Sequence, residues 1–171
     1  MSAVLAQSRL ERVMAMAHTD IEIVDWSDEY LIQAADIAQE MHVNSIYRDL
    51  PLDEAKVLSQ LIAAGNGVVP DRYFRIAVLH GEALGGFYGH VRRTFFCDEI
   101  LAHDLGWWVK KSARNTMAAP MLLLDFERWA REKGARKIMV GQSTEQDIEK
   151  TTRLFANCGF RVIGFNTVKD L

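Results

Sequence analysis

The order of periodic segments along the chain predicts an α/β protein with a mixed central sheet. Two kinds of pattern point to this class. Short runs rich in Val, Ile, Phe and Tyr, some with alternating apolar and polar residues, are typical of strands. Longer segments with apolar residues three or four positions apart are typical of helices. In sequence order the segments give β-α-α-β-β-β-α-β-α-β, and no internal repeat or low-complexity linker interrupts them.

Turn and capping residues mark the elements of the N-terminal half. Ser27, followed by two acidic residues, is suited to cap a helix. His80-Gly81-Glu82 is a hairpin-style turn, and the glycines that follow it indicate a bulge or a close backbone approach. The expected elements are a strand over 21–26, a helix from Ser27 to about Met41, a helix from Asp53 to Gly65, and strands over 72–79 and 83–96.

The C-terminal half alternates strands and helices. Gly134 and Gly159 are placed to end two helices, and Ser143 to Gln146 form a capping-box pattern before the second of them. The expected elements are a strand over 99–109, a basic loop over 110–117, a helix over 118–133, a strand over 135–140, a helix containing Ile148, Phe155 and Cys158, and a last strand over 160–165.

Composition limits the classes of protein that need to be considered. At 171 residues one domain is expected, over 21–171, with residues 1–20 as an N-terminal extension. The net charge of −3 gives no general attraction to nucleic acid. Cys97 and Cys158 lack metal-ligand spacing, so we expect no metal site, no disulfide framework and a cytoplasmic setting. No apolar run is long enough to span a membrane, and the N-terminus lacks a signal-peptide core.

The loop after residue 109 is the best candidate for a binding site. Lys110, Lys111 and Arg114 lie between a predicted buried strand and a predicted helix. A helix start has unpaired backbone N–H groups and the positive end of the helix dipole. Cations beside such an end favour a phosphate or diphosphate ligand. In isolation, however, three basic residues before a helix are usually a solvated turn.

Residues 109–122, Val-Lys-Lys-Ser-Ala-Arg-Asn-Thr-Met-Ala-Ala-Pro-Met-Leu, resemble the acetyl-CoA loop of the GCN5-related N-acetyltransferases (GNATs). That loop reads V-x-P-x-x-[RQ]-x-x-G-x-[GA]-x-x-L, so Lys111 replaces Pro and Met117 replaces Gly. Residues 104–109 are similar to the E-[IL]-G-Y-W-[LV] strand of the branch that acetylates ribosomal proteins. Residues 154–160 match the family's [FL]-Y-x-x-x-G-F run, with Phe155 in place of Tyr. The resemblance covers about residues 20–171 and implies the GNAT fold.

The resemblance implies acetyl transfer from acetyl-CoA to a primary amine by direct attack, without a metal. The amine could belong to a small molecule, a peptide N-terminus or a lysine. Asp104 is the first candidate for the general base, with Glu99 on the same strand as a second. Dimers are common among similar proteins, so a homodimer is a candidate assembly. The residues expected to bind the cofactor are Trp107, Trp108, Val109, Lys110, Lys111, Arg114, Asn115, Thr116, Met117, Ala118, Ala119 and Phe155.

Two departures from the family pattern keep an alternative open. Met117 is expected to crowd a backbone that a diphosphate approaches closely, and Phe155 lacks the hydroxyl that could protonate the leaving thiolate. A catalytically silent GNAT-fold module that binds coenzyme A or a protein partner is therefore the alternative. A nucleic-acid-binding module has only the basic loop in its favour. The acceptor wall is expected near His42, Tyr47, Asp49 and Asp53.

Overall fold

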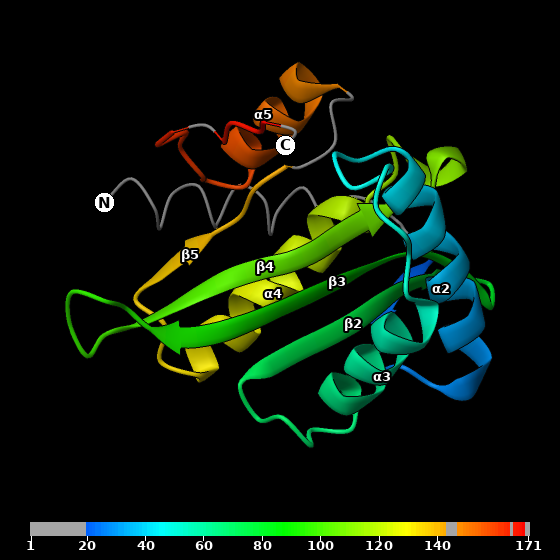
Figure 1. Ribbon diagram of the computed structural model, residues 1–171, viewed down its shortest axis with the longest axis horizontal. Helices are drawn as coiled ribbons and strands as arrows, with labels where there is room; N and C mark the ends of the chain where they lie inside the picture. The colour runs from blue at the N-terminus through cyan, green and yellow to red at the C-terminus, as the bar shows by residue number, and fades with distance from the viewer. Residues whose placement is uncertain (1–19, 143–146, 165, 170–171) are drawn as a thin grey trace.

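The computed structural model describes residues 20–142, 147–164 and 166–169 (Figure 1). The expected N-terminal extension and the capping box at 143–146 therefore lie outside the described residues, apart from Asp20. The elements are β1 (Ile21–Val24), α2 (Asp28–Val43), α3 (Glu54–Gly65), β2 (Arg72–Leu79), β3 (Glu82–Arg93), β4 (Ile100–Val109), a 3₁₀ turn (Lys111–Ala113), α4 (Ala118–Glu132), β5 (Lys137–Met139) and α5 (Ile148–Asn157).

The five strands form one mixed sheet in the order β1-β2-β3-β4-β5. The first three pairings are antiparallel, and β5 pairs with β4 in parallel. Short connections join β2 to β3 and β3 to β4, whereas α2 and α3 lie between β1 and β2. The mixed α/β class predicted from the sequence is confirmed. Among the described residues, no helix combines the length and the apolarity that crossing a bilayer requires.

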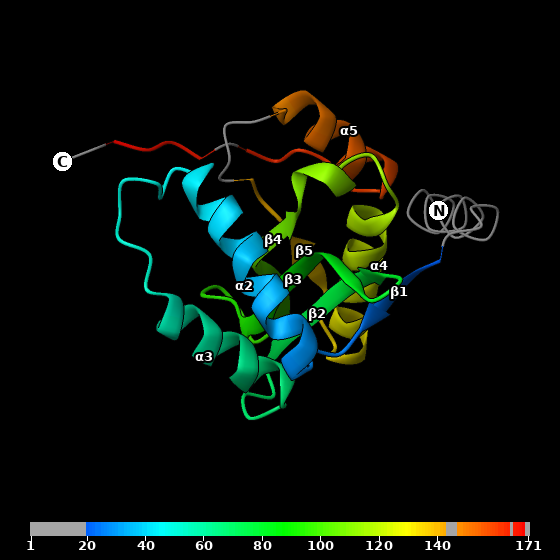
Figure 2. The ribbon, with the colours of Figure 1, turned by 90° about the vertical axis from the view of Figure 1, so that its right-hand side faces the viewer.

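Helices cover both faces of the sheet (Figure 2). On one face α2 and α3 bury a cluster that includes Leu61, Ile76 and Trp108. On the other face α4 packs Leu122 and Phe126 against the strands. Gly89 allows this contact, because a Cβ at that position would lie 2.6 Å from the Phe126 ring. The close backbone approach expected around the strand glycines is confirmed at Gly85, where a Cβ would lie 2.4 Å from the Trp108 carbonyl oxygen.

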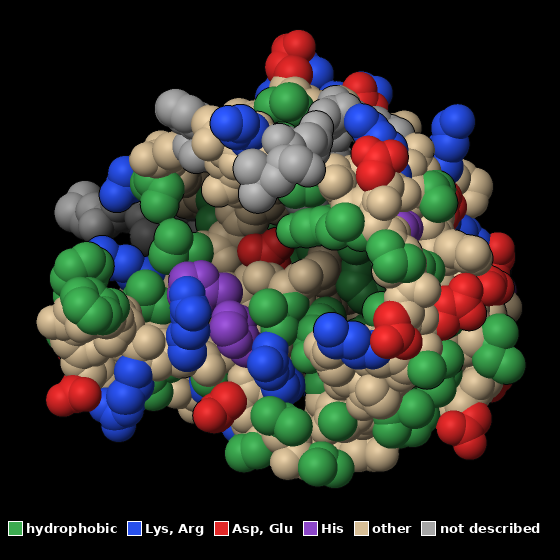
Figure 3. All heavy atoms as spheres, viewed as in Figure 1, with side chains coloured by type: hydrophobic (Ala, Val, Ile, Leu, Met, Phe, Trp, Pro, Cys, Tyr) green, Lys and Arg blue, Asp and Glu red, His purple; other side chains and the backbone are tan. Residues whose placement is uncertain are grey.

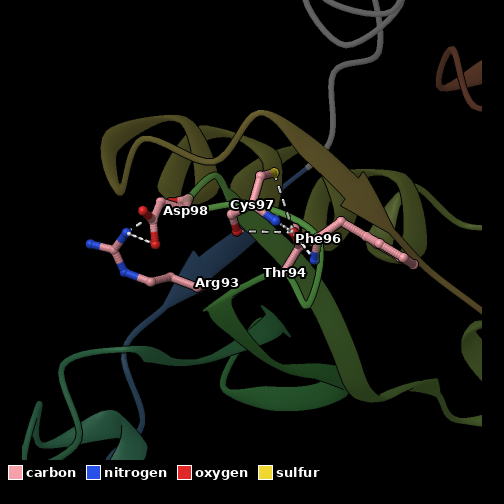
Figure 4. Close-up of polar contacts among 5 residues, drawn as sticks. All are labelled: Arg93, Thr94, Phe96, Cys97 and Asp98. Atoms are coloured by element: carbon pink, nitrogen blue, oxygen red, sulfur yellow. Dashed lines mark hydrogen bonds and ion pairs between the residues drawn. The ribbon is translucent and has the colours of Figure 1, made fainter.

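The β3–β4 connection is longer than expected and is held by Thr94 (Figure 4). The Thr94 hydroxyl accepts the backbone N–H groups of Phe96 and Cys97 and donates to the Cys97 carbonyl. Arg93 pairs with Asp98 across the turn. Because this side chain competes with the sheet for backbone groups, β3 ends at Arg93 and not at residue 96.

The prediction of a last strand over 160–165 is wrong for residues 160–164, which the structure describes. Residues 160–164 follow α5 but carry no strand, and residues 161–164 are exposed. The neighbouring β5 has only three residues, so it offers no long edge for a further strand to pair with. The sheet therefore ends at β5, and α5 with the segment after it lies beside the end of β4 (Figure 1).

Candidate active site

The site begins where two neighbouring strands separate. Strand β5 pairs with β4 only from Leu101 to His103. Beyond His103, within the described residues, the β5-facing edge of β4 has no strand partner. An unpaired strand edge exposes backbone N–H and C=O groups that an extended ligand can bind. The six remaining residues of β4, Asp104 to Val109, therefore form one wall of an open gap.

A β-bulge lies at the start of this gap. Gly89 pairs with Asp104 and Tyr88 pairs with Gly106, so Leu105 has no partner on β3. A bulge bends its strand and redirects the flanking side chains. Leu105 is 45% exposed as a result, although it lies in the middle of a long strand.

The gap is part of a cleft of about 710 Å³. The face shown in Figure 3 is hollowed here, with hydrophobic side chains around the hollow. Segments distant in sequence line the cleft: α2, β4, the loop after it, the start of α4 and α5. Of the residues predicted for the site, the cleft is lined by Asp104, Trp107, Trp108, Val109, Lys111, Arg114, Asn115, Thr116 and Ala119.

The loop between β4 and α4 presents backbone N–H groups to this cleft. Asn115 has a φ of 76°, in the left-handed region that Asn tolerates better than most residues. Among the described residues, the N–H groups of Asn115, Met117 and Ala119 have no protein acceptor. Outward N–H groups next to a left-handed residue at a helix start form a cradle suited to anions.

The protein itself uses the other donors of the loop. The N–H groups of Arg114 and Thr116 donate to carbonyls of the preceding turn, and that of Ala118 donates to the Thr116 hydroxyl. Three of the six backbone amides from Arg114 to Ala119 are thus used within the protein. The tight 3₁₀ turn closes these hydrogen bonds locally, and alternate amides remain open.

The three basic residues of the loop point to different places. Lys111 and Arg114 line the cleft. Lys110 instead pairs with Glu82 at the start of β3, and its side chain is only 16% exposed. Its backbone N–H donates to Leu84 O at 2.9 Å, which ties the end of β4 to β3. Two of the three predicted cations are thus placed to meet an anion.

Asp104 is the carboxylate at the point where β4 and β5 separate. It accepts a hydrogen bond from the Gly141 N–H at 3.1 Å. Burial raises the pKa of its carboxyl from an ordinary 3.8 to about 6, because burial disfavours the charged form. A carboxylate with a pKa just below neutrality is deprotonated at pH 7 and still basic enough to take a proton.

The two tryptophans of β4 lie on opposite faces of the sheet. Trp108 stacks on Phe74 with ring centroids 6.4 Å apart, on the side of α2 and α3. Trp107 contacts Phe87 and Phe155 on the other side. Both residues line the cleft, and both indole N–H groups are buried without a partner among the described residues. Buried donors of this kind are usually satisfied by a ligand or by water.

Several predicted residues do not line the cleft. Phe155 packs behind Trp107, and Met117 packs on the core together with the buried Ala118. The Met117 side chain packs on the core and its φ of −77° is open to any residue, while crowding of a bound diphosphate stays a prediction. Glu99 lies at the opposite end of β4, where it pairs with Arg136 at 3.7 Å. It is thus separated from the cleft.

The residues expected to form the acceptor wall differ in whether they line the cleft. Tyr47 lines it, whereas His42 and Asp49 do not, and Asp53 caps α3 by accepting the Lys56 N–H. Four further cleft residues, contributed by α2 and its end, were not predicted from the sequence: Ile37, Glu40, Met41 and Asn44. The last three of these lie three, four and seven positions after Ile37, which places them on one face of a helix. The spacing does not indicate which part of the molecule that face meets. The part of the chain that the structure describes holds no cluster of three metal-ligating side chains.

A five-stranded mixed sheet with a separated β4–β5 pair and helices on both faces is the fold of the GNAT acetyltransferases. Residues 28–160 match the sequence profile of the acetyltransferase (GNAT) family. The chain therefore belongs to the GNAT acetyltransferase family. No curated protein sequence matches it.

Solved structures share this fold across nearly their whole length. An acetyltransferase from Trypanosoma brucei is 17% identical with a TM-score of 0.66, covering 89% of this chain and 100% of its own. Glucosamine-6-phosphate N-acetyltransferase from Arabidopsis thaliana is 10% identical with a TM-score of 0.69, covering 89% and 99%. A GNAT family acetyltransferase from Staphylococcus aureus is 13% identical with a TM-score of 0.57, covering 90% and 100%. At these identities the likeness concerns the fold.

Proposed function

We propose that the protein is an N-acetyltransferase that moves the acetyl group of acetyl-CoA to a primary amine by direct attack. The observation that carries the proposal is that Asn115 and Ala119, whose backbone N–H groups have no protein acceptor among the described residues, line the same cleft as the unpaired end of β4. A diphosphate on these amides and on Arg114 would leave the pantetheine arm free to extend along the unpaired edge of β4. Acetyl-CoA supplies an activated acyl carbon and a thiol leaving group.

Each wall of the cleft has a separate task in this proposal. Lys111 and Arg114 neutralise the diphosphate charge, while backbone groups of Trp107 to Val109 orient the arm and offer an N–H to the acetyl oxygen. Asp104 takes the proton that the attacking ammonium must lose, directly or through water. Trp107, backed by Phe155, keeps water from this end of the gap.

The acceptor side supports an amine with an apolar body. Met41 of α2, together with the half-exposed Tyr47 and Leu105, gives this side of the cleft apolar surface beside the polar Glu40 and Asn44. Apolar walls with few polar groups are typical of sites for small ligands. Phenethylamine is thus expected to be a better acceptor than spermidine or glucosamine 6-phosphate.

A thermal-shift titration with acetyl-CoA tests the proposal first. A ligand that binds the native state must raise the melting temperature, so no shift at millimolar acetyl-CoA would refute the proposal. Thiol release with phenethylamine, spermidine, glucosamine 6-phosphate and a lysine peptide then tests transfer. Acetylated amine identified by mass spectrometry is the expected result.

A coenzyme A-binding module without transferase activity is the second candidate. Phe155 favours it, because the position that carries a Tyr hydroxyl in similar proteins holds here a ring packed against Trp107. Cys158, one turn later, packs on the core and does not line the cleft. A thermal shift with acetyl-CoA but no product with any amine would select this candidate.

A further inference from the structure

One carboxylate already occupies part of the anion site. The Lys111 backbone N–H donates to Glu40 Oε1 at 3.3 Å, and the Arg114 guanidinium lies 3.9 Å from the same oxygen. Glu40 belongs to α2, so this contact crosses the cleft and joins the acceptor wall to the cofactor loop. The two donors it uses belong to the loop on which the proposed function places the diphosphate.

The contact depends on a residue in which this chain departs from similar loops. Lys111 stands where the related pattern has Pro, which carries no backbone N–H. With Pro at this position the hydrogen bond to Glu40 could not form. Lys111 therefore supplies both a cation for the cleft and the donor that holds Glu40 against the loop.

We propose that Glu40 is an internal competitor of the cofactor diphosphate. Its carboxylate and the diphosphate have like charges, line the same cleft and share Arg114, so binding must displace Glu40 from the guanidinium or accept the repulsion. Glu40 thereby lowers the affinity for coenzyme A as well as for acetyl-CoA. Product release is rate-limiting in many enzymes, and where it is, weaker binding of coenzyme A speeds turnover. This inference rests on the proposed function.

The direct test is calorimetric binding of coenzyme A to the Glu40→Gln variant. Gln keeps the size of the side chain but removes its charge, so the dissociation constant is expected to fall about fivefold, the scale of one partly exposed charge interaction. Asp36→Asn is the matched control, since it removes one charge from an exposed position one turn earlier on α2. The control is expected to leave coenzyme A affinity unchanged. Pantetheine, which has no diphosphate, should bind both variants as it binds the wild type.

A second pair of variants tests the backbone contact without changing Glu40. Lys111→Pro and Lys111→Ala remove the same charge, but only Pro removes the N–H that holds the carboxylate. Coenzyme A should bind the Pro variant about twofold more tightly than the Ala variant. Ligand-free melts of all variants check that each is folded.

The outcomes separate this inference from the proposed function. The inference is supported if Glu40→Gln binds coenzyme A more tightly than the wild type and Asp36→Asn does not. It also requires that Lys111→Pro bind coenzyme A more tightly than Lys111→Ala. Unchanged or weaker binding by Glu40→Gln, or an equal gain from Asp36→Asn, overturns it while wild-type binding keeps the proposed function intact. A wild-type protein that does not bind coenzyme A overturns both.

Discussion

The two walls of the cleft are built from different chemical groups. On the loop side the donors are backbone N–H groups, and their direction is set by one left-handed residue and a short 3₁₀ turn. On the β4 and α2 side the chemistry depends on side chains, above all on Asp104, whose carboxyl is perturbed by its surroundings. Backbone donors do not depend on side-chain identity, and the Met117 side chain packs on the core. The chemistry expected of Asp104, in contrast, is lost when its carboxyl is replaced.

Removal of the Asp104 carboxylate should have the largest effect. The Asp104→Asn variant keeps the shape of the side chain and an oxygen for the Gly141 N–H, but it loses the base, so kcat is expected to fall by about 10²- to 10⁴-fold. In the wild type, activity should rise with pH through about 6 as this carboxyl loses its proton, and the variant should lack this step. The measurement is a pH profile at saturating substrate with an amine that the wild type acetylates.

Glu99→Gln is the matched comparison on the same strand. It removes a carboxylate that lies outside the cleft, so activity and its pH dependence are expected to stay close to those of the wild type. A large loss of activity in Glu99→Gln and none in Asp104→Asn would indicate that Glu99, not Asp104, is the general base.

Charge reversal on the loop should have the next largest effect. Arg114→Glu places a carboxylate beside the diphosphate and beside Glu40, so acetyl-CoA affinity is expected to fall by roughly 30-fold or more. Arg153→Glu on α5 reverses a charge that pairs only with Glu149 among the described contacts and should have little effect. Equal thermal shifts for Arg114→Glu and the wild type would show that the diphosphate lies elsewhere.

The raised pKa of Asp104 also predicts a cost in stability. Native Asp104 has a pKa of about 6, above its ordinary 3.8, so between these values the native state holds more protons than the unfolded state. Stability therefore falls as pH rises through this window, and the loss remains at higher pH. Asp104→Asn should be more stable than the wild type at pH 7 by on the order of 2 kcal/mol. Denaturation at pH 7 and at pH 4 checks this, and a difference that did not shrink at pH 4 would contradict it.

Substitutions that change the backbone conformation at Asn115 should have the smallest effect on stability and binding. They test directly the loop whose backbone N–H groups face the cleft. Asn115→Val forces a β-branched residue into the left-handed region and is expected to cost about 1–2 kcal/mol of stability and to weaken acetyl-CoA binding. Asn115→Gly accepts the same φ and should retain binding. Denaturation and calorimetry measure both. If the two variants behaved alike, the turn would not depend on this dihedral angle.

The sequence could predict what local patterns determine. Helix α4 begins at Ala118 as expected, because the stripe of Leu122, Phe126 and Trp129 is a property of neighbouring residues. Strand β2 matches its predicted range, and Ser27 and Asp53 precede helices as expected. The anion loop was also detectable, since a strand, basic residues and a helix start follow one another directly.

What depends on distant contacts could not be predicted in the same way. The direction of Lys110 is set by Glu82, 28 residues away in the chain, and the place of Glu40 is set by a loop 71 residues away. The end of β3 depends on the Thr94 hydroxyl, which competes with the sheet. Neither the inward side chain of Met117 nor the absence of strand structure over 160–164 follows from a local pattern.

The brief pairing of β5 with β4 has a consequence for how the molecule opens. Three residue pairs join β5 to the sheet, and α5, which has no fully buried residue, contacts the core mainly through the partly buried Phe155. In native-state hydrogen exchange the amides of β5 and α5 should lose protection well before those of β2 and β3. A cofactor spanning the gap would clamp this loosely attached unit to the sheet and slow its exchange.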